Sequence, residues 1–199
     1  NILIGTLGED TFVGLAGADT VNCGGTYDSA TKSWTGDSAA DLVVYTSPGD
    51  GWNSSGVAYS YDRLIAFETG RDVVAFTQEF NGGAWDLDDI HGDGAFTFQN
   101  DGNANFSTDH EALRLAMDAK AKAAVLTQPG FTAVAMAVNK GGVVAAEGDD
   151  GLLVVTAGGS TGIYYYQESD GRANNISGAE MTLLGVADAN LSAADFIFG

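Results

Sequence analysis

A nine-residue repeat near the start of the chain constrains the fold more than any other sequence feature. Residues 5–13 (GTLGEDTFV) and residues 14–22 (GLAGADTVN) align without gaps. Both copies have glycine at the first and fourth positions, aspartate at the sixth and a large apolar residue at the eighth. A chain that repeats glycine turns with this period is expected to coil, with each copy forming a turn and a short strand.

Partial copies flank the two clear ones. Residues 1–4 (NILI) fit the last four positions of a preceding copy, with Asn1 in the aspartate position. Residues 36–44 (GDSAADLVV) form a degenerate third copy that keeps Gly36 and Asp41. Residues 23–35 are therefore expected to bulge from the coil as a loop.

The repeat also predicts a metal site. Glycine-rich nonapeptides with this aspartate form parallel β-rolls that bind calcium, and calcium takes about six to eight oxygen ligands. Successive half-turns lie on opposite sides of such a roll, so ligands come from copies n and n+2. We expect Asp10 to pair with Asp41 of the third copy, and Asn1 with Asp19. The turn residues expected to contribute main-chain oxygens are Gly5, Leu7, Gly14, Ala16 and Gly36.

At these residues the chain resembles the RTX family of bacterial proteins, which are exported by type I secretion. Residues 62–74 (DRLIAFETGRDVV) approximate a segment that follows the repeats in RTX proteases, lipases and alginate-epimerase modules. The resemblance implies that Asp62 and Asp72 help to close the last calcium sites. Residues 176–186 and 191–199 look like the C-termini of RTX and S-layer-type secreted proteins, where the uncleaved C-terminus carries the secretion signal.

The charge of the chain narrows the range of partners. It has 27 acidic and 8 basic residues, a net charge of −19. Such a chain repels nucleic acids and anionic membranes, and no apolar run approaches the roughly 20 residues that span a bilayer. A single cysteine, Cys23, excludes an intrachain disulfide and is expected to be a small buried residue. Metal is then the expected staple of a secreted protein.

The remaining chain is expected to be mainly β. A capping pattern followed by Ala, Leu, Met and Lys predicts one helix over residues 109–126. Glycine-rich turns separate expected strands of an antiparallel meander. These strands are expected at residues 131–138, 143–147, 152–156 and 163–167. The predicted fold is a short parallel β-roll with its closing strands (1–80), followed by an antiparallel β-sandwich-like region with one α-helix and a secretion-signal-like tail (81–199).

We expect a calcium-folded, non-enzymatic C-terminal module of an S-layer or adhesin-like protein on the surface of a Gram-negative bacterium. Its expected partners are calcium and either other surface-protein copies or cell-surface glycan. Residues 158–162 (GGSTG) match a hydrolase motif, but expected strands on both sides deny it the strand–elbow–helix context. The alternative is a non-catalytic glycan-binding or secretion module of a secreted RTX enzyme. Its sugar-stacking candidates are Trp34, Trp52, Trp85 and Tyr164–Tyr166, which could equally be core and surface aromatics of strands.

Overall fold

The computed structural model describes residues 1–47, 49–50, 61–76, 98–100, 112–117, 131–143, 145–172 and 176–198. Strands dominate these residues, which confirms the predicted mainly β class. Their one α-helix is α2 (Phe131–Gly141), and no helix in this part is long and apolar enough to cross a membrane. The strands are β1 (Ile2–Ile4), β2 (Thr11–Val13), β3 (Thr20–Asn22), β4 (Thr26–Asp28), β5 (Ser33–Thr35), β6 (Leu42–Tyr45), β7 (Asp62–Ile65), β8 (Val73–Phe76), β9 (Phe98–Asn100), β10 (Ala112–Met117), β11 (Asp150–Ala157), β12 (Ser160–Gln167), β13 (Met181–Ala187) and β14 (Phe196–Phe198).

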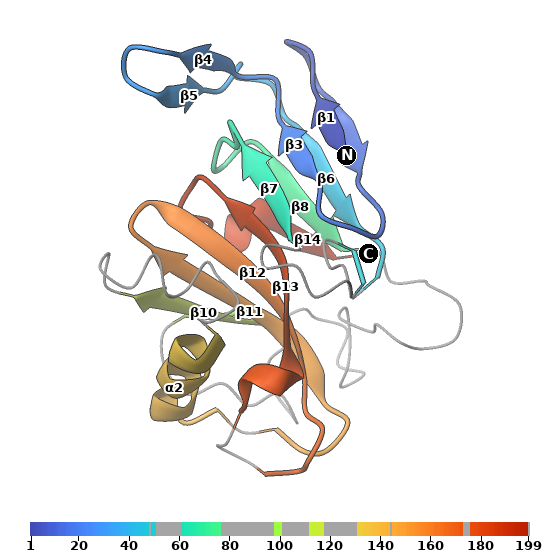
Figure 1. Cartoon of the computed structure of the whole chain (residues 1–199), viewed down its shortest axis with the longest axis vertical. Coiled ribbons are helices and arrows are strands. Elements are labelled where there is room, and N and C mark those ends of the chain that lie inside the picture. Colours follow the sequence, from blue (N-terminus) through green and yellow to red (C-terminus); the bar gives the residue numbers. More distant parts are fainter. Residues whose placement is uncertain are drawn as a thin grey trace.

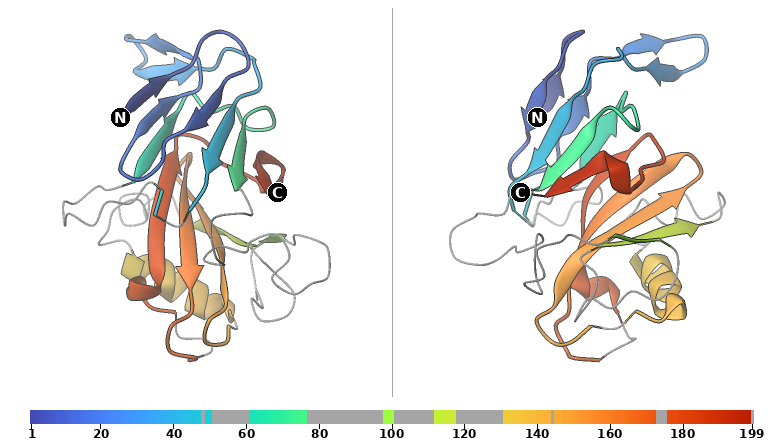
Figure 2. Two further views of the ribbon diagram at one scale, coloured as in Figure 1. Left: turned by 90° about the vertical axis from the view of Figure 1, so that its right-hand side faces the viewer. Right: turned by 180° about the vertical axis from the view of Figure 1, so that it is seen from behind.

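Alternate strands of the N-terminal part enter two different parallel sheets, so the chain coils as a β-roll (Figures 1 and 2). β1, β3 and β7 lie side by side in the larger sheet, whereas β2, β6 and β8 lie side by side in the smaller one. The eighth position of each clear copy points inward, and Phe12 and Val21 are buried between the sheets. The predicted parallel roll is therefore present.

The register follows the repeat. Ile2 pairs with Thr20, which lies two nine-residue copies further along the chain. Thr11 pairs with Leu42 because an antiparallel hairpin, β4–β5, is inserted between them. The hairpin projects from the roll, as expected for the bulge at residues 23–35 (Figure 1).

The C-terminal strands extend both sheets of the roll. β13 pairs in parallel with β7, and β14 pairs in parallel with β8. From β13 the larger sheet continues through β12 and β11 as an antiparallel meander, and then through β10 and β9 in parallel. Two strand pairings therefore cross the predicted boundary at residue 80.

Two apolar cores cover the two faces of the larger sheet. The first lies between the two sheets and includes Tyr45, Leu64, Val154 and Phe196. The second lies between the meander and α2, which packs on the outer face of the sheet (Figure 1). The roll and the meander thus share one sheet and one continuous inner core.

The predicted helix over residues 109–126 is wrong at residues 112–117, which form β10. The rest of that range lies outside the described residues. β10 is held between β9 and β11, and Leu113 and Leu115 are buried against the second core. Pairing on both sides outweighs the helix propensity of these residues.

The strand predicted at residues 131–138 is also wrong, since this segment lies in α2. Val134, Ala135 and Val138 are buried while Met136 is 68% exposed, which is the spacing of a helix face and not of a strand. No described residue between 143 and 147 lies in a strand. The strands predicted at residues 152–156 and 163–167 are confirmed within β11 and β12.

Candidate metal centre

The turns of the roll line two edges. The first edge is made by turns that lead from the larger sheet to the smaller one, at residues 5–10, 23–41 and 66–72. The second edge is made by turns that lead back, at residues 14–19 and 46–61, of which 48 and 51–60 lie outside the described part. Parallel stacking repeats each edge position from coil to coil, so like residues meet there.

An aspartate precedes or begins β2, β3, β6, β7 and β8 of the roll, and aspartates of successive coils stack on one another. On the first edge the Asp10 amide donates to Asp41 Oδ1 (2.8 Å), and the Asp41 amide donates to Asp72 Oδ1 (3.1 Å). On the second edge the Asp19 amide donates to Asp62 Oδ1 (2.8 Å). Asp10 and Asp41 are therefore neighbours on the first edge, and their expected pairing as ligands of one ion stays a prediction.

Asn1 also lies where the repeat predicts. Its charged amino group donates to Asp19 Oδ1 as an ion pair, and its carbonyl accepts from the Thr20 amide at 2.9 Å. Each edge is thus a ladder of aspartate side-chain oxygens joined by main-chain nitrogens, which Asn1 enters through its amino group and its carbonyl. The ladder residues are Asp10, Asp41 and Asp72 on the first edge and Asn1, Asp19 and Asp62 on the second.

The same carboxylates hold their own turns closed. The Thr6 amide donates to Asp10 Oδ2 (2.6 Å), and the Glu68 amide donates to Asp72 Oδ2 (2.7 Å). The Thr46 amide donates to Asp50 Oδ2 (2.6 Å) in the same four-residue arrangement. These hydrogen bonds therefore hold the carboxylates in place without a bound ligand.

These carboxylates are deeply buried, and the one charged partner that the described residues give any of them is the amino group of Asn1, which pairs with Asp19. Asp19, Asp41, Asp62 and Asp72 are between 1% and 3% exposed. Within the described residues no Lys or Arg side chain forms an ion pair with any of them. Asp19 Oδ2, Asp37 Oδ2 and Asp41 Oδ2 are buried and accept no hydrogen bond. Buried charges in this state are costly unless a counter-charge is supplied.

Burial of these carboxylates raises the pKa of three of them. Burial raises the pKa of Asp62 to about 7, and the neighbouring negative charges of Asp19 and Asp50 add to the effect. Burial likewise raises the pKa of Asp72 to about 6. The pKa of Asp41 is raised too, by burial and then by nearby acidic groups that include Asp37. Hydrogen bonds from main-chain amides oppose these shifts but do not cancel them.

Glycines leave room where carboxylates of successive coils converge. A Cβ on Gly14 would lie 2.8 Å from Asp19 Oδ2 and 3.5 Å from Asp62 Oδ2. A Cβ on Gly24, which has φ +81°, would overlap both the Thr6 carbonyl oxygen and Asp37 Oδ2. Oxygens from two coils therefore surround a small space on each edge.

The turn residues predicted to supply main-chain oxygens differ in how close they lie to the carboxylates of the two edges. A Cβ on Gly5 would lie 2.9 Å from Asp10 Oδ2, and one on Gly36 would overlap the Glu68 carboxylate. Ala16 forms a bridge with Asp50 across the second edge. Leu7 has an 80% exposed side chain at the tip of its turn. The prediction that these five residues supply main-chain ligands stays a prediction.

Several acidic residues of the edges were not predicted as ligands. Asp37 and Glu68 join the first edge, where Glu68 Oε2 accepts from the Ser38 amide at 2.6 Å. Asp50 joins the second edge. A four-residue spacing could have identified two of them. Asp50 follows Thr46 by four residues, as Asp10 follows Thr6. Glu68 precedes Asp72 by the same spacing. Asp37 carries no such spacing signal.

The candidate sugar-stacking tyrosines do not form a surface. Tyr164, Tyr165 and Tyr166 are at most 5% exposed and belong to the two cores. Trp52 and Trp85 lie outside the described residues. Trp34 instead lines a cavity of about 290 Å³ between the β4–β5 hairpin and the β11–β12 turn.

Ser160 of the hydrolase-like motif begins β12 after a turn at Gly158 and Gly159. It is 2% exposed and lies in a hairpin, not at a strand-to-helix elbow. The context required for a nucleophile is missing at this position.

Comparisons with protein-family models, with curated proteins and with solved structures found no match to this chain. The site is therefore interpreted from its own chemistry.

Proposed function

We propose that this chain binds calcium along the edges of its roll and serves as a calcium-folded module of a secreted bacterial surface protein, of RTX type. One observation carries the proposal: the carboxylates of Asp19 and Asp62 are buried, come from successive coils and converge beside Gly14 without a cationic side chain. Asp19 Oδ2 accepts no hydrogen bond there. A bound cation would supply the missing positive charge.

The ligand chemistry favours calcium on this edge. The side chains nearest to a Cβ on Gly14, those of Asp19 and Asp62, offer hard carboxylate oxygens, and calcium prefers such ligands in flexible arrangements of about six to eight oxygens. Asp10, Asp37 and the Thr6 carbonyl offer a similar set on the first edge. The ladders would then bind one ion between each pair of stacked turns.

The biological proposal follows from coupling between metal and folding. In a calcium-poor cytoplasm the buried carboxylates and the net charge of −19 oppose compaction. Millimolar calcium outside the cell would neutralise the edges and stabilise the roll by mass action. This sequence of events suits export of an expanded chain by type I secretion and assembly on the surface of a Gram-negative cell. In this proposal the module is not catalytic.

Calorimetric titration with calcium tests the proposal. The wild-type chain should bind calcium, and Asp19→Asn should remove at least one ion from the stoichiometry, because the amide keeps the shape but not the charge of the ligand. Asp28→Asn is the matched control, since it removes one exposed carboxylate in the projecting hairpin. Wild-type protein that binds no calcium, or equal loss in both variants, would refute the proposal.

A second candidate function is glycan binding, and one observation favours it. The cavity beside Trp34 also contains Lys32 and Asp188, so an aromatic face lies with polar groups that could bind hydroxyls. A screen of surface polysaccharides by tryptophan fluorescence tests it. Binding that Trp34→Ala abolishes would support a glycan module, and no response to any glycan would remove this candidate.

A further inference from the structure

Cys23 occupies a special position in the repeat. It lies nine residues after Gly14, which lies nine residues after Gly5, so the three share the first position of the nonapeptide frame. At Gly5 and Gly14 an added Cβ would lie 2.9 Å and 2.8 Å from the carboxylate at the sixth position of its own copy. A side chain at this position therefore points into the ladder. Cys23 is the one first-position residue of the three that has a side chain.

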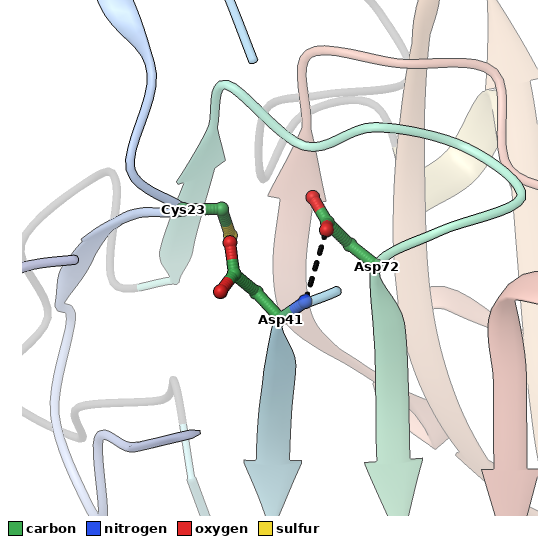
Figure 3. A group of neighbouring side chains, drawn as sticks. All are labelled: Cys23, Asp41 and Asp72. Atoms are coloured by element: carbon green, nitrogen blue, oxygen red, sulfur yellow. Dashed lines mark hydrogen bonds between the residues drawn. The ribbon is translucent and has the colours of Figure 1, made fainter. Parts of the chain in front are cut away.

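The thiol of Cys23 meets two carboxylates of the first edge. The Cys23 Sγ and one oxygen each of Asp41 and Asp72 all lie within 4.8 Å of one another. Figure 3 shows the Cys23 side chain directed at the Asp41 carboxylate, with the Asp72 carboxylate on the far side accepting from the Asp41 amide. The three residues are 1%, 2% and 1% exposed. They form a compact buried group from two successive turns of the first edge.

An unsatisfied atom indicates that this group lacks a partner. Asp41 is 2% exposed, and its Oδ2 accepts no hydrogen bond. The neighbouring Asp37 Oδ2 on the same edge is buried and equally unpartnered. Burial, followed by the charges of Asp72 and Asp41, raises the pKa of the Cys23 thiol. A cation at the centre of the three side chains would supply a positive charge to this buried group.

We propose that Cys23, Asp41 and Asp72 bind a thiophilic divalent cation, with zinc the best fit, at a site distinct from the oxygen-only spaces of the roll. The inference rests on the proposed function in treating the edges as cation sites, but it assigns a different class of ion to this one. Sulfur is a poor ligand for calcium and a preferred one for zinc. Zinc sites take about four ligands, and Asp37 or water would complete the set.

Binding requires a balanced proton transfer and no redox step. The Cys23 thiol loses its proton to solvent as the sulfur–metal bond forms, and the carboxylates bind in their ionised state. Three negative charges then surround a doubly positive ion. The carboxylates of Asp19 and Asp62 meet on the second edge without a sulfur ligand, so the soft cation would bind beside Cys23 while calcium binds the oxygen-only spaces.

Cadmium titration tests the inference, because cadmium bound to a thiolate absorbs in the ultraviolet. The reduced, metal-free chain should develop this charge-transfer band and saturate at one cadmium per chain, and zinc should remove the band by competition. Cys23 is the sole cysteine of the chain, so the band has only one source. Cys23→Ser should show no band, and Asp41→Asn should weaken cadmium binding by about tenfold or more, whereas Asp28→Asn should match the wild type.

Calcium binding is measured in parallel on the same variants. Cys23→Ser that keeps calcium binding but loses the cadmium band supports the inference. A wild-type chain without the band, a band that needs two chains per cadmium, or equal cadmium affinity in urea would overturn it. Failure of the wild type to bind calcium while the band is present would overturn the proposed function and leave the soft-metal site standing.

Discussion

At the scale of single residues, the roll buries aspartate carboxylates, and main-chain amides donate hydrogen bonds to them. Asp62 receives a hydrogen bond from the Asp19 amide across the ladder, which stabilises a charged carboxylate only in part. Burial outweighs this hydrogen bond, so the pKa of Asp62 stays raised, at about 7. The positions of the ladder aspartates follow directly from the nine-residue period, since stacking brings equal positions together.

This balance predicts that the metal-free chain becomes more stable as the pH falls. The folded-state pKa values of about 7 for Asp62 and about 6 for Asp72 lie above the ordinary value of 3.8, so the folded chain binds more protons between these limits. Stability should therefore rise as pH falls from about 7 towards 3.8, and be lowest above 7. Urea midpoints in EDTA measure this, and Asp62→Asn should flatten the profile. A urea midpoint that decreases as the pH falls from about 7 towards 3.8 would contradict this prediction.

Gly24 supplies a second prediction at this scale. Gly24→Ala should weaken calcium binding on the first edge, because its Cβ would overlap the Thr6 carbonyl and Asp37 Oδ2. Gly159→Ala is a matched control: its φ of +83° is nearly the same as the +81° of Gly24, but a Cβ there meets nothing within 4 Å. Both variants should lose about 1–2 kcal/mol of stability to the left-handed backbone, and Gly24→Ala should lose more because of this overlap.

Only Gly24→Ala should lose calcium affinity, by about tenfold, as expected when one of several ligands is displaced. Calorimetric titration of the two variants measures the difference. Equal calcium affinity in both variants would show that the space beside Gly24 does not hold the ion.

At the scale of elements, the sequence predicts the roll better than the meander. The turns and strands of the roll are set by local glycine spacing, so the repeat predicts that residues 1–4 stack on 14–22 and residues 5–13 on 36–44. β10 could not be predicted in this way. Its residues favour a helix, and it becomes a strand because β9 and β11, distant in sequence, pair with it on both sides. The apolar run of α2 is short enough to fit either a helix or a strand.

The assignment of α2 leads to a mutational test. In a strand, residues 136 and 138 would share one face, whereas in a helix they point in different directions. Val138→Ala should cost about 2 kcal/mol because Val138 is fully buried against the meander. Met136→Ala should cost less than about 0.5 kcal/mol because Met136 is 68% exposed. Urea denaturation measures both, and similar costs would favour a strand over residues 131–138.

At the scale of the whole molecule, β13 and β14 connect the roll to the rest of the chain. They are the last strands in sequence, and each continues one sheet of the roll. Phe196 of β14 stacks against Phe76 of β8 at 6.3 Å between ring centroids. Stabilising the roll should therefore stabilise the meander, because the inner core spans both. Sequence patterns did not reveal this closure, since it depends on pairing between residues more than 100 positions apart.

Thermal unfolding of the chelator-treated chain, followed by far-ultraviolet circular dichroism with and without calcium, tests whether calcium stabilises the roll. One ion at about a hundredfold excess over its Kd adds about 2.7 kcal/mol, which raises Tm by about 5–10 °C for a chain of this size. We expect at least this increase, its reversal by EDTA, and its reduction in Asp19→Asn but not in Asp28→Asn. A Tm that is indifferent to calcium and EDTA would show that calcium does not stabilise this chain.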